Sequence, residues 1–197
     1  MYFNFEYPYF DTCYPYPRTP YTNFYRNSSL DTLDTNVESP NPSIAVSYIK
    51  GGPSYPNIKG IVSFLSVPGG SEVSVYVEGL PSYKPATKST QPIGPFGFHI
   101  HSIGCCDIGN PNDPFTCASG HWNPDNQPHG NHAGDFPVLF SNHGMCKMSF
   151  FTDRFKPKDI IGLSVIIHES PDDYRSQPSG NSGKRIACGL IQNPFIY

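Results

Sequence analysis

The sequence predicts an all-β domain, an antiparallel sandwich or barrel of about eight short strands. Its composition is the first reason, because 22 prolines, 18 glycines and 13 tyrosines in 197 residues favour short strands and turns over helices. The second is the pattern itself, since short apolar or alternating runs separated by turn residues recur from Ser43 onward, with no convincing helix. A chain of this length can bury a core as one domain.

The expected strands follow one another at short intervals. They cover residues 44–49, 60–65, 73–77, a run around His99, 136–140, 145–151, 163–168 and 185–191. Pro68-Gly69-Gly70 separates the second and third strands and predicts a hairpin. Two long polar loops interrupt the pattern, one after His101 and one over 169–183. Long loops without regular structure are usually functional or disordered.

Residues 1–42 differ from the domain at 43–197. Tyrosines alternate there with prolines and a polar stretch follows, and X-Pro steps favour extended backbone. We expect an extended or disordered tail. The alternative is an anchoring segment whose tyrosines stack on, or cross-link to, an assembly.

Charge and hydropathy exclude several classes of partner. The net charge is −3 and the basic residues are scattered, so neither nucleic acid nor a membrane surface is an expected partner. No apolar run approaches the ~20 residues that span a bilayer. No secretory signal is evident at the N-terminus, which leaves a cytoplasmic or a cell- or spore-surface location in a bacterium open.

Histidines dominate the stretch from Gly97 to Asp135. His99 and His101 occupy alternate positions of a strand and therefore share one face, while Ile100 points to the other. The candidate ligands are six histidines and one carboxylate, namely His99, His101, His121, His129, His132, His168 and Asp135. This set is enough for two metal ions, and nitrogen donors with one carboxylate suit copper and zinc.

From about Ser43 to the end, the chain resembles the copper/zinc superoxide dismutases, in a form of bacterial character. The matching motifs are GFHIH, SGHWNP, PHG, HAGDFP, VIIHE followed by Asp172, and GNSGKRIACGLI. The resemblance implies an eight-stranded Greek-key barrel with the metals held outside it by the two long loops. It also implies conversion of superoxide to dioxygen and hydrogen peroxide by Cu(II)/Cu(I) cycling, with zinc as the structural and tuning metal.

The resemblance also implies roles for individual residues. The copper ligands are His99, His101, His121 and His168, and the zinc ligands are His121, His129, His132 and Asp135. Asp172 hydrogen-bonds one histidine of each metal, and Arg185 sits beside the open copper position to receive the anion. His121 is suited to a proton role in catalysis. His143 matches nothing in the family and is expected on the surface.

The chain departs from the family pattern at three places. His129 and His132 are closer in sequence than the corresponding ligands usually are in the family. Three residues span at most ~10 Å, so one turn can still aim both rings at a single ion. The alternative is an altered zinc site. Cys188 needs a partner among Cys105, Cys106 and Cys117, and the bacterial spacing favours Cys106. Cys117 and Cys146 either form another bridge or stay reduced. The loop over 169–184 lacks the charged insertion of animal members, so guidance of the substrate is expected to differ.

A second function stays open beside the enzymatic one. The barrel could serve as a catalytically weak, metal-binding structural protein of a coat or assembly, with contacts through the tail. A homodimer is compatible with the sequence, which carries no decisive interface signature.

Overall fold

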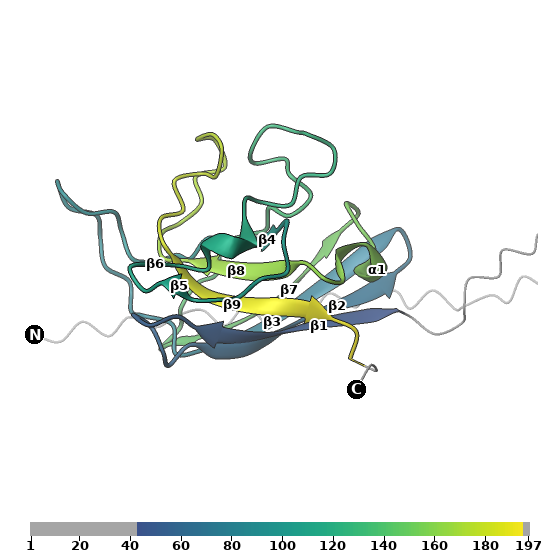
Figure 1. The fold of residues 1–197 in the computed structure, drawn as a ribbon, viewed down its shortest axis with the longest axis horizontal. Helices are drawn as coiled ribbons and strands as arrows, with labels where there is room; N and C mark the ends of the chain where they lie inside the picture. The colour runs from purple at the N-terminus through teal and green to yellow at the C-terminus, as the bar shows by residue number, and fades with distance from the viewer. Residues whose placement is uncertain (1–42, 195–197) are drawn as a thin grey trace, which may run out of the picture. The chain divides into compact units, whose positions relative to one another are not determined.

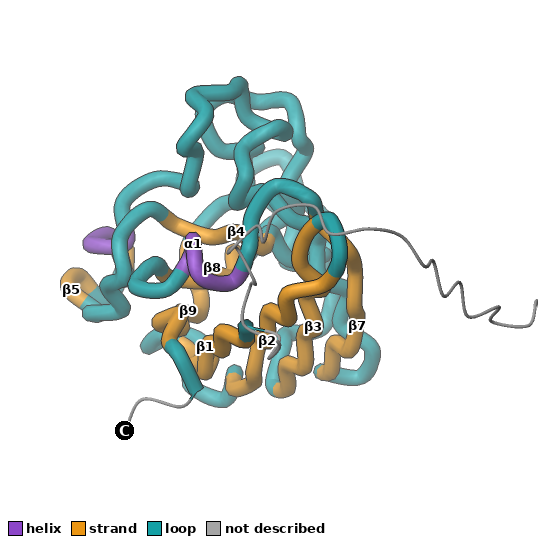
Figure 2. Tube along the Cα trace, turned by 90° about the vertical axis from the view of Figure 1, so that its right-hand side faces the viewer, coloured by secondary structure: helices purple, strands orange, loops and turns teal. Residues whose placement is uncertain are grey.

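A computed structural model describes residues 43–194, so the predicted tail at 1–42 lies outside the described part of the chain. One curled antiparallel sheet of seven strands dominates it, in the order β4-β8-β9-β1-β2-β3-β7 (Figures 1 and 2). The strands are β1 (Ile44–Gly51), β2 (Lys59–Val67), β3 (Gly70–Glu78), β4 (Phe98–His101), β7 (Met145–Thr152), β8 (Ser164–His168) and β9 (Arg185–Gln192). The predicted all-β antiparallel class is confirmed.

The hairpin of β2 and β3 shows how the sequence pattern builds the core. Val67 pairs with Gly70 across the predicted turn, and Gly69 adopts the positive φ of 82° that this turn needs. Phe64 on β2 and Val73 on β3 are paired and fully buried, on the face that packs into the core. Burying such side chains contributes about 1.5–3 kcal/mol each, which fixes the register of the sheet.

The chain crosses from one edge of the sheet to the other after β3. It re-enters at β4, beside β8, and only after a long loop returns as β7 beside β3, which is a Greek-key connection. The segment over 135–142 lies between the two edges. Single bridges join it to the β4 side at Asp135 and Leu139, and Asn142 pairs with Met145 at the start of β7. These bridges close the curled sheet toward a barrel.

The prediction of a regular strand over 136–140 is wrong. Pro137 has no N–H to give to a ladder, and the N–H of Val138 donates to the Tyr174 hydroxyl at 3.0 Å. Only Leu139 pairs, exchanging two 2.9 Å backbone hydrogen bonds with Phe96. The eighth strand position is therefore occupied by a bridged loop.

Several short elements were not predicted. They are the hairpin of β5 (Gly109–Asn110) and β6 (Asp113–Pro114), the 3-10 turn η1 (Thr116–Ala118) and the helix α1 (Pro157–Ile160). The helix α1 is four residues long, too short to show a helical period. Within residues 43–194, no helix has the length and apolarity to cross a membrane.

The two long loops, one between β4 and β7 and one between β8 and β9, rise on the same side of the sheet, beside β4 and β8 (Figure 1). Phe98 and Ile100 on β4, and Val165 and Ile167 on β8, point into the core. Alternate residues of these two strands therefore face the loops. This face carries the histidines.

Candidate metal centre

Strands β4 and β8 place three histidines on one face. Ile100 is in the core, as predicted, so His99 and His101 point outward together. His168 ends the neighbouring strand, and its Nε2 lies 3.2 Å from Nε2 of His101. All three side chains are buried beneath the loops.

His121 joins this group from the long loop. A single bridge pairs it with His101, and the N–H of Trp122 donates to the Ile100 carbonyl at 2.8 Å. Its ring stacks on His99 with a centroid distance of 3.9 Å. The potential ligand atoms of His99, His101, His121 and His168 all lie within 4.8 Å of one another.

A second group surrounds the carboxylate of Asp135. Its Oδ1 lies 2.9 Å from Nδ1 of His121 and 3.3 Å from Nδ1 of His132, and its Oδ2 lies 3.3 Å from Nδ1 of His129. The backbone N–H groups of Gly130 and His132 also donate to Oδ2. The tight turn at Gly130, with φ of 88°, lets the short His129–His132 spacing aim both rings at Asp135.

Two polar side chains hold this short loop from outside. Gln177 accepts a hydrogen bond from the N–H of His129 at 2.9 Å and donates to its carbonyl at 3.4 Å. Arg154 donates to the carbonyl of His132 at 2.7 Å. These contacts were not predictable from the sequence, because no local pattern marks a side chain that hydrogen-bonds to the backbone of a residue far away in the chain.

Asp172 lies between the two groups and is buried. It accepts hydrogen bonds from Nε2 of His99 at 2.7 Å and from Nε2 of His129 at 2.8 Å. The N–H of Tyr174 donates to the same Oδ1 atom that His129 uses, at 2.7 Å. A Cβ on Gly180 would overlap this carboxylate and the His129 ring, so only glycine fits there. With Nε2 protonated toward Asp172, both rings leave Nδ1 free for another partner.

Buried ring nitrogens without partners indicate that metal ions complete the centre. Nδ1 of His99, Nε2 of His121, Nδ1 of His129 and Nδ1 of His132 are buried with no hydrogen bond. Leaving a buried polar atom unpaired costs about 1–3 kcal/mol, so several in one place call for a ligand. The four-histidine group suits copper, and three histidines with one carboxylate suit tetrahedral zinc.

Arg185 opens β9 next to the four-histidine group. Its two terminal nitrogens donate to the carbonyls of Phe115 and Ser119, the latter at 2.6 Å. The Ser119 carbonyl also accepts from Nδ1 of His101 at 2.8 Å, so one oxygen links the guanidinium to a candidate ligand. Burial lowers the pKa of Arg185, and Asp113 opposes the effect. Phe115 and Ser119 act through backbone carbonyls, for which the sequence carries no signal.

Comparison with known proteins agrees with this geometry. The family model for copper/zinc superoxide dismutase (SODC) matches residues 58–191. The chain belongs to the copper/zinc superoxide dismutase family. It is similar to the "Superoxide dismutase [Cu-Zn]" of Deinococcus radiodurans, with 34% identity over 152 residues, which cover 68% of this chain and 78% of that protein.

Two further relatives extend the likeness. The protein of the same description from Paramecium bursaria Chlorella virus 1 is 32% identical over 177 residues, which cover 82% of this chain and 83% of that protein. The solved copper/zinc superoxide dismutase of Brucella abortus matches with a TM-score of 0.61 and 27% identity, over 76% of this chain and 99% of that one. The copper and zinc of this family are the metals that the two groups fit.

Three histidines of this dismutase-family chain, His99, His101 and His168, are kept neutral. Burial, followed by the neighbouring His168 and His121, holds the pKa of His99 and of His101 well below its usual value. Burial, followed by His121, lowers the pKa of His168 to about 3. Burial alone would raise the pKa of Asp135, but the hydrogen bond from His121 and the electrostatic interactions with His121, His129 and His132 together outweigh it, and the pKa is lowered. Neutral imidazole and ionised carboxylate are the forms that bind metals.

These shifts predict that the metal-free protein loses stability in mild acid. An unfolded histidine titrates near 6.5, so below that pH the unfolded chain binds protons that folded His99, His101 and His168 do not take. The free energy of unfolding therefore keeps its full value above pH ~6.5. Below that pH it falls by up to about 1.4 kcal/mol per pH unit for each residue. Denaturant unfolding of metal-free protein between pH 7.5 and 5.5 measures this. A free energy of unfolding that stays flat over this range would contradict the burial of the three rings.

Two disulfides fix the long loop. Cys106 is bonded to Cys188 on β9, and Cys105 to Cys117. Cys146, offered as a partner for Cys117, is instead a free, buried thiol. Cys13 lies outside the described residues.

His143 stays apart from the centre. It lies in the turn before β7, exposed and with a positive φ of 53°, as expected of a surface residue. The structure thus brings together six of the seven histidines and separates the one that matched no motif.

Proposed function

We propose that this protein is a superoxide dismutase that converts superoxide to dioxygen and hydrogen peroxide. The observation that carries the proposal is the position of one ring, His121, between the two donor groups. Its Nδ1 faces Asp135 at 2.9 Å, and its Nε2 is buried without a hydrogen bond and is left for the group of His99, His101 and His168. A single imidazole is thereby shared between an all-nitrogen site and a mixed site.

The ligand assignments follow from the two groups. We assign copper to His99, His101, His121 and His168, and zinc to His121, His129, His132 and Asp135. Copper supplies the one-electron couple by which one superoxide is oxidised to dioxygen and a second, with two protons, is reduced to hydrogen peroxide. Zinc has no redox chemistry and fits the structural role.

Arg185 is suited to bind the substrate anion. Its charge is permanent at neutral pH, and two of its N–H groups are fixed by carbonyls, which leaves the others to donate to a small anion. The shared Ser119 carbonyl keeps the guanidinium beside His101. Such a local positive charge attracts superoxide even though the net charge of the protein is −3.

Asp172 and His121 determine where protons lie in the site. Asp172 accepts from Nε2–H of both His99 and His129, and so presents their Nδ1 lone pairs to the metals. Nε2 of His121 has no protein partner, so it could bind copper and, when not bound to it, hold a proton close to the bound anion. The other rings of the group are buried too deeply to charge near neutral pH.

Metal analysis combined with a dismutation assay tests the proposal. Protein reconstituted with both ions should hold one copper and one zinc per chain and remove superoxide close to the diffusion limit, about 10⁸–10⁹ M⁻¹s⁻¹. Zinc in both sites, with no activity after copper loading, would instead support the structural alternative.

We further propose that residues 43–197 carry the whole activity and that the segment 1–42 is an appendage, through which any contact with an assembly would run. Deleting residues 1–42 should leave metal content and the dismutation rate unchanged within about twofold, because every proposed ligand lies at or beyond residue 99. The rate of the truncated protein, measured beside the full chain, decides this. A large loss of activity would place part of the site in the tail. Light scattering of both forms would show whether the protein is a homodimer and whether the tail contributes.

A further inference from the structure

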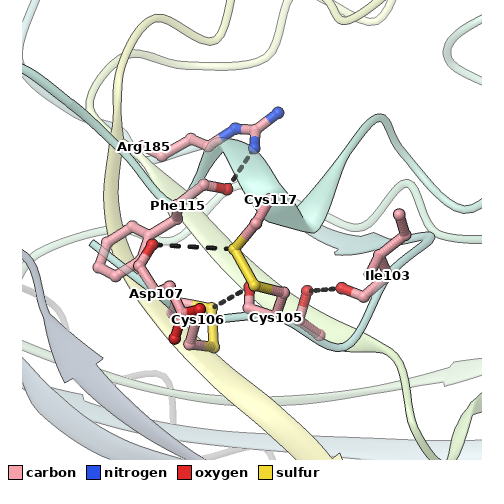
Figure 3. Close-up of a disulfide and its surroundings, with 9 residues drawn as sticks. Ile103, Cys105, Cys106, Asp107, Phe115, Cys117 and Arg185 are labelled. Carbon is pink, nitrogen blue, oxygen red and sulfur yellow. Dashed lines mark hydrogen bonds between the residues drawn. A yellow bond between two sulfur atoms is a disulfide. The ribbon is translucent and has the colours of Figure 1, made fainter. Parts of the chain in front are cut away.

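The Cys105–Cys117 disulfide lies beside the contact between Arg185 and the Phe115 carbonyl (Figure 3). Cys117 is the middle residue of η1, and Phe115 and Ser119 flank this turn. The carbonyls of these two flanking residues are the acceptors for the guanidinium. One crosslink therefore sits between the two backbone oxygens that orient Arg185.

Both acceptor residues have an unfavourable backbone. Phe115 has φ of 63° and Ser119 has φ of 64°, a region that residues with a side chain rarely occupy. Such conformations persist only where the surroundings impose them. Near Phe115 the backbone bonds that could impose this are long, 3.3 Å from Phe115 N–H to Ile108 and 3.2 Å from Ile103 N–H to Ala118, against a usual 2.9–3.0 Å. The Ser119 side is held more closely, by the 2.8 Å contact of its carbonyl with His101 and by the 2.9 Å bond from Ser102 N–H to Gly120.

The remaining anchors of this segment lie at the ends of η1. Phe115 and Ala118 pack in a small cluster with Ile166 and Cys188. The Cys106–Cys188 bridge fixes only the beginning of the loop to β9. Residues 107–113 between them are exposed, and the hairpin of β5 and β6 has two residues in each strand. The covalent link at Cys117 restrains the middle of the turn, between these packed ends.

We propose that the Cys105–Cys117 disulfide is a positioning crosslink, which holds the Phe115 and Ser119 carbonyls against Arg185 and so keeps the guanidinium beside His101. This inference rests on the proposed function, in which Arg185 binds the substrate anion. Opening the bridge frees η1, and Arg185 loses its fixed acceptors. The backbones of the metal ligands are held by β4, by β8 and by the pairing at Trp122, so the ligands stay in place. Of the copper ligands, His101 also contacts the Ser119 carbonyl, through Nδ1.

The double variant Cys105→Ser/Cys117→Ser tests this in full-length protein loaded with copper and zinc. Azide is the probe, as a small anion whose binding to the copper(II) form is followed by absorption. We expect the Kd for azide to rise about 10-fold and the superoxide rate to fall by a similar factor, within the range of coupled neighbours. Metal content should be unchanged, and Cys146→Ala, which removes a cysteine but no bridge, should behave as wild type.

Combining these changes with Arg185→Ala separates positioning from a general structural effect. In the Arg185→Ala background, removing the disulfide should alter the Kd for azide by less than about twofold, because the group that it positions is gone. An equal rise in both backgrounds would overturn the proposal. Unchanged azide affinity in the double serine variant, or loss of copper from it, would do the same.

The wild-type protein provides a second test should the double serine variant fail to fold. Cys188 is buried, so a mild phosphine should open Cys105–Cys117 first in zinc-loaded protein, as thiol counting can verify. The NMR signal of the Arg185 Nε–H should then broaden or shift, and an unchanged signal would overturn the proposal. Neither this signal nor azide binding requires turnover. An inactive copper-loaded wild type would refute the proposed function while these readouts still judge the crosslink.

Discussion

His121→Ala should lose more dismutase activity than any other single substitution in the protein. The residue contributes to both ligand groups, so its removal leaves three donors at each site and cuts the link between them. Loss of a residue that only supports a metal ligand typically costs 10–100-fold in metal affinity or activity, and a shared ligand should cost more than about 100-fold. Metal content and the dismutation rate of the reconstituted variant measure the effect.

His143→Ala is the matched control for this substitution. The same residue type is removed from an exposed turn that belongs to neither group. Copper, zinc and activity should all remain at wild-type values. If His121→Ala kept both metals and its rate, the shared-ring account would be wrong.

Asp172→Asn should weaken copper binding about 10–100-fold while sparing zinc. The reason is an asymmetry at the carboxylate. Oδ1 accepts both from Nε2 of His129 and from the backbone N–H of Tyr174, which cannot act as an acceptor. An asparagine must therefore keep its oxygen at this position and turn its amide nitrogen toward His99.

The turned amide changes the state of His99. Its Nε2 then has to accept a hydrogen bond, which moves the ring proton to Nδ1 and blocks the atom that faces the metal. Competition titrations with chelators for each metal give the two affinities. Asp153→Asn, at an exposed carboxylate in the turn after β7, is the control and should match wild type. Equal weakening of copper and zinc would contradict the proposed orientation of the asparagine.

Gly180→Ala approaches the same carboxylate from the other side. The added Cβ would overlap Asp172 and the His129 ring, and the φ of 66° at this position disfavours any side chain. Gly180→Ala should therefore weaken the binding of zinc as well as that of copper. Asp172→Asn, by contrast, should change only the tautomer of His99 and so weaken copper alone.

The alternation of a strand explains why part of the centre was predictable. His99 and His101 share a face because side chains alternate, and Ile100 between them enters the core as the pattern required. The ordered motifs indicated the remaining histidines, Asp135, Asp172 and Arg185. The structure gathers six of the seven histidines and Asp135 into two groups, and it places Asp172 between them.

Other features depend on contacts between distant segments, which local pattern does not encode. The carbonyl of Ser119 serves both His101 and Arg185, yet a serine in a polar loop predicts nothing of the kind. Gln177, in the second long loop and 48 positions away, accepts a hydrogen bond from the backbone N–H of His129. The expected strand over 136–140 does not form because Pro137 has no N–H to give to a ladder. The next N–H, of Val138, donates to Tyr174 in the second long loop, which the local pattern does not reveal.

The central claim is that one imidazole joins a copper site to a zinc site. Anomalous diffraction from crystals of the metal-loaded protein, recorded at the copper and zinc absorption edges, tests it most directly. We predict a copper signal among His99, His101, His121 and His168, and a separate zinc signal among His121, His129, His132 and Asp135. One metal at both positions, or a His121 ring bound to a single ion, would contradict the account.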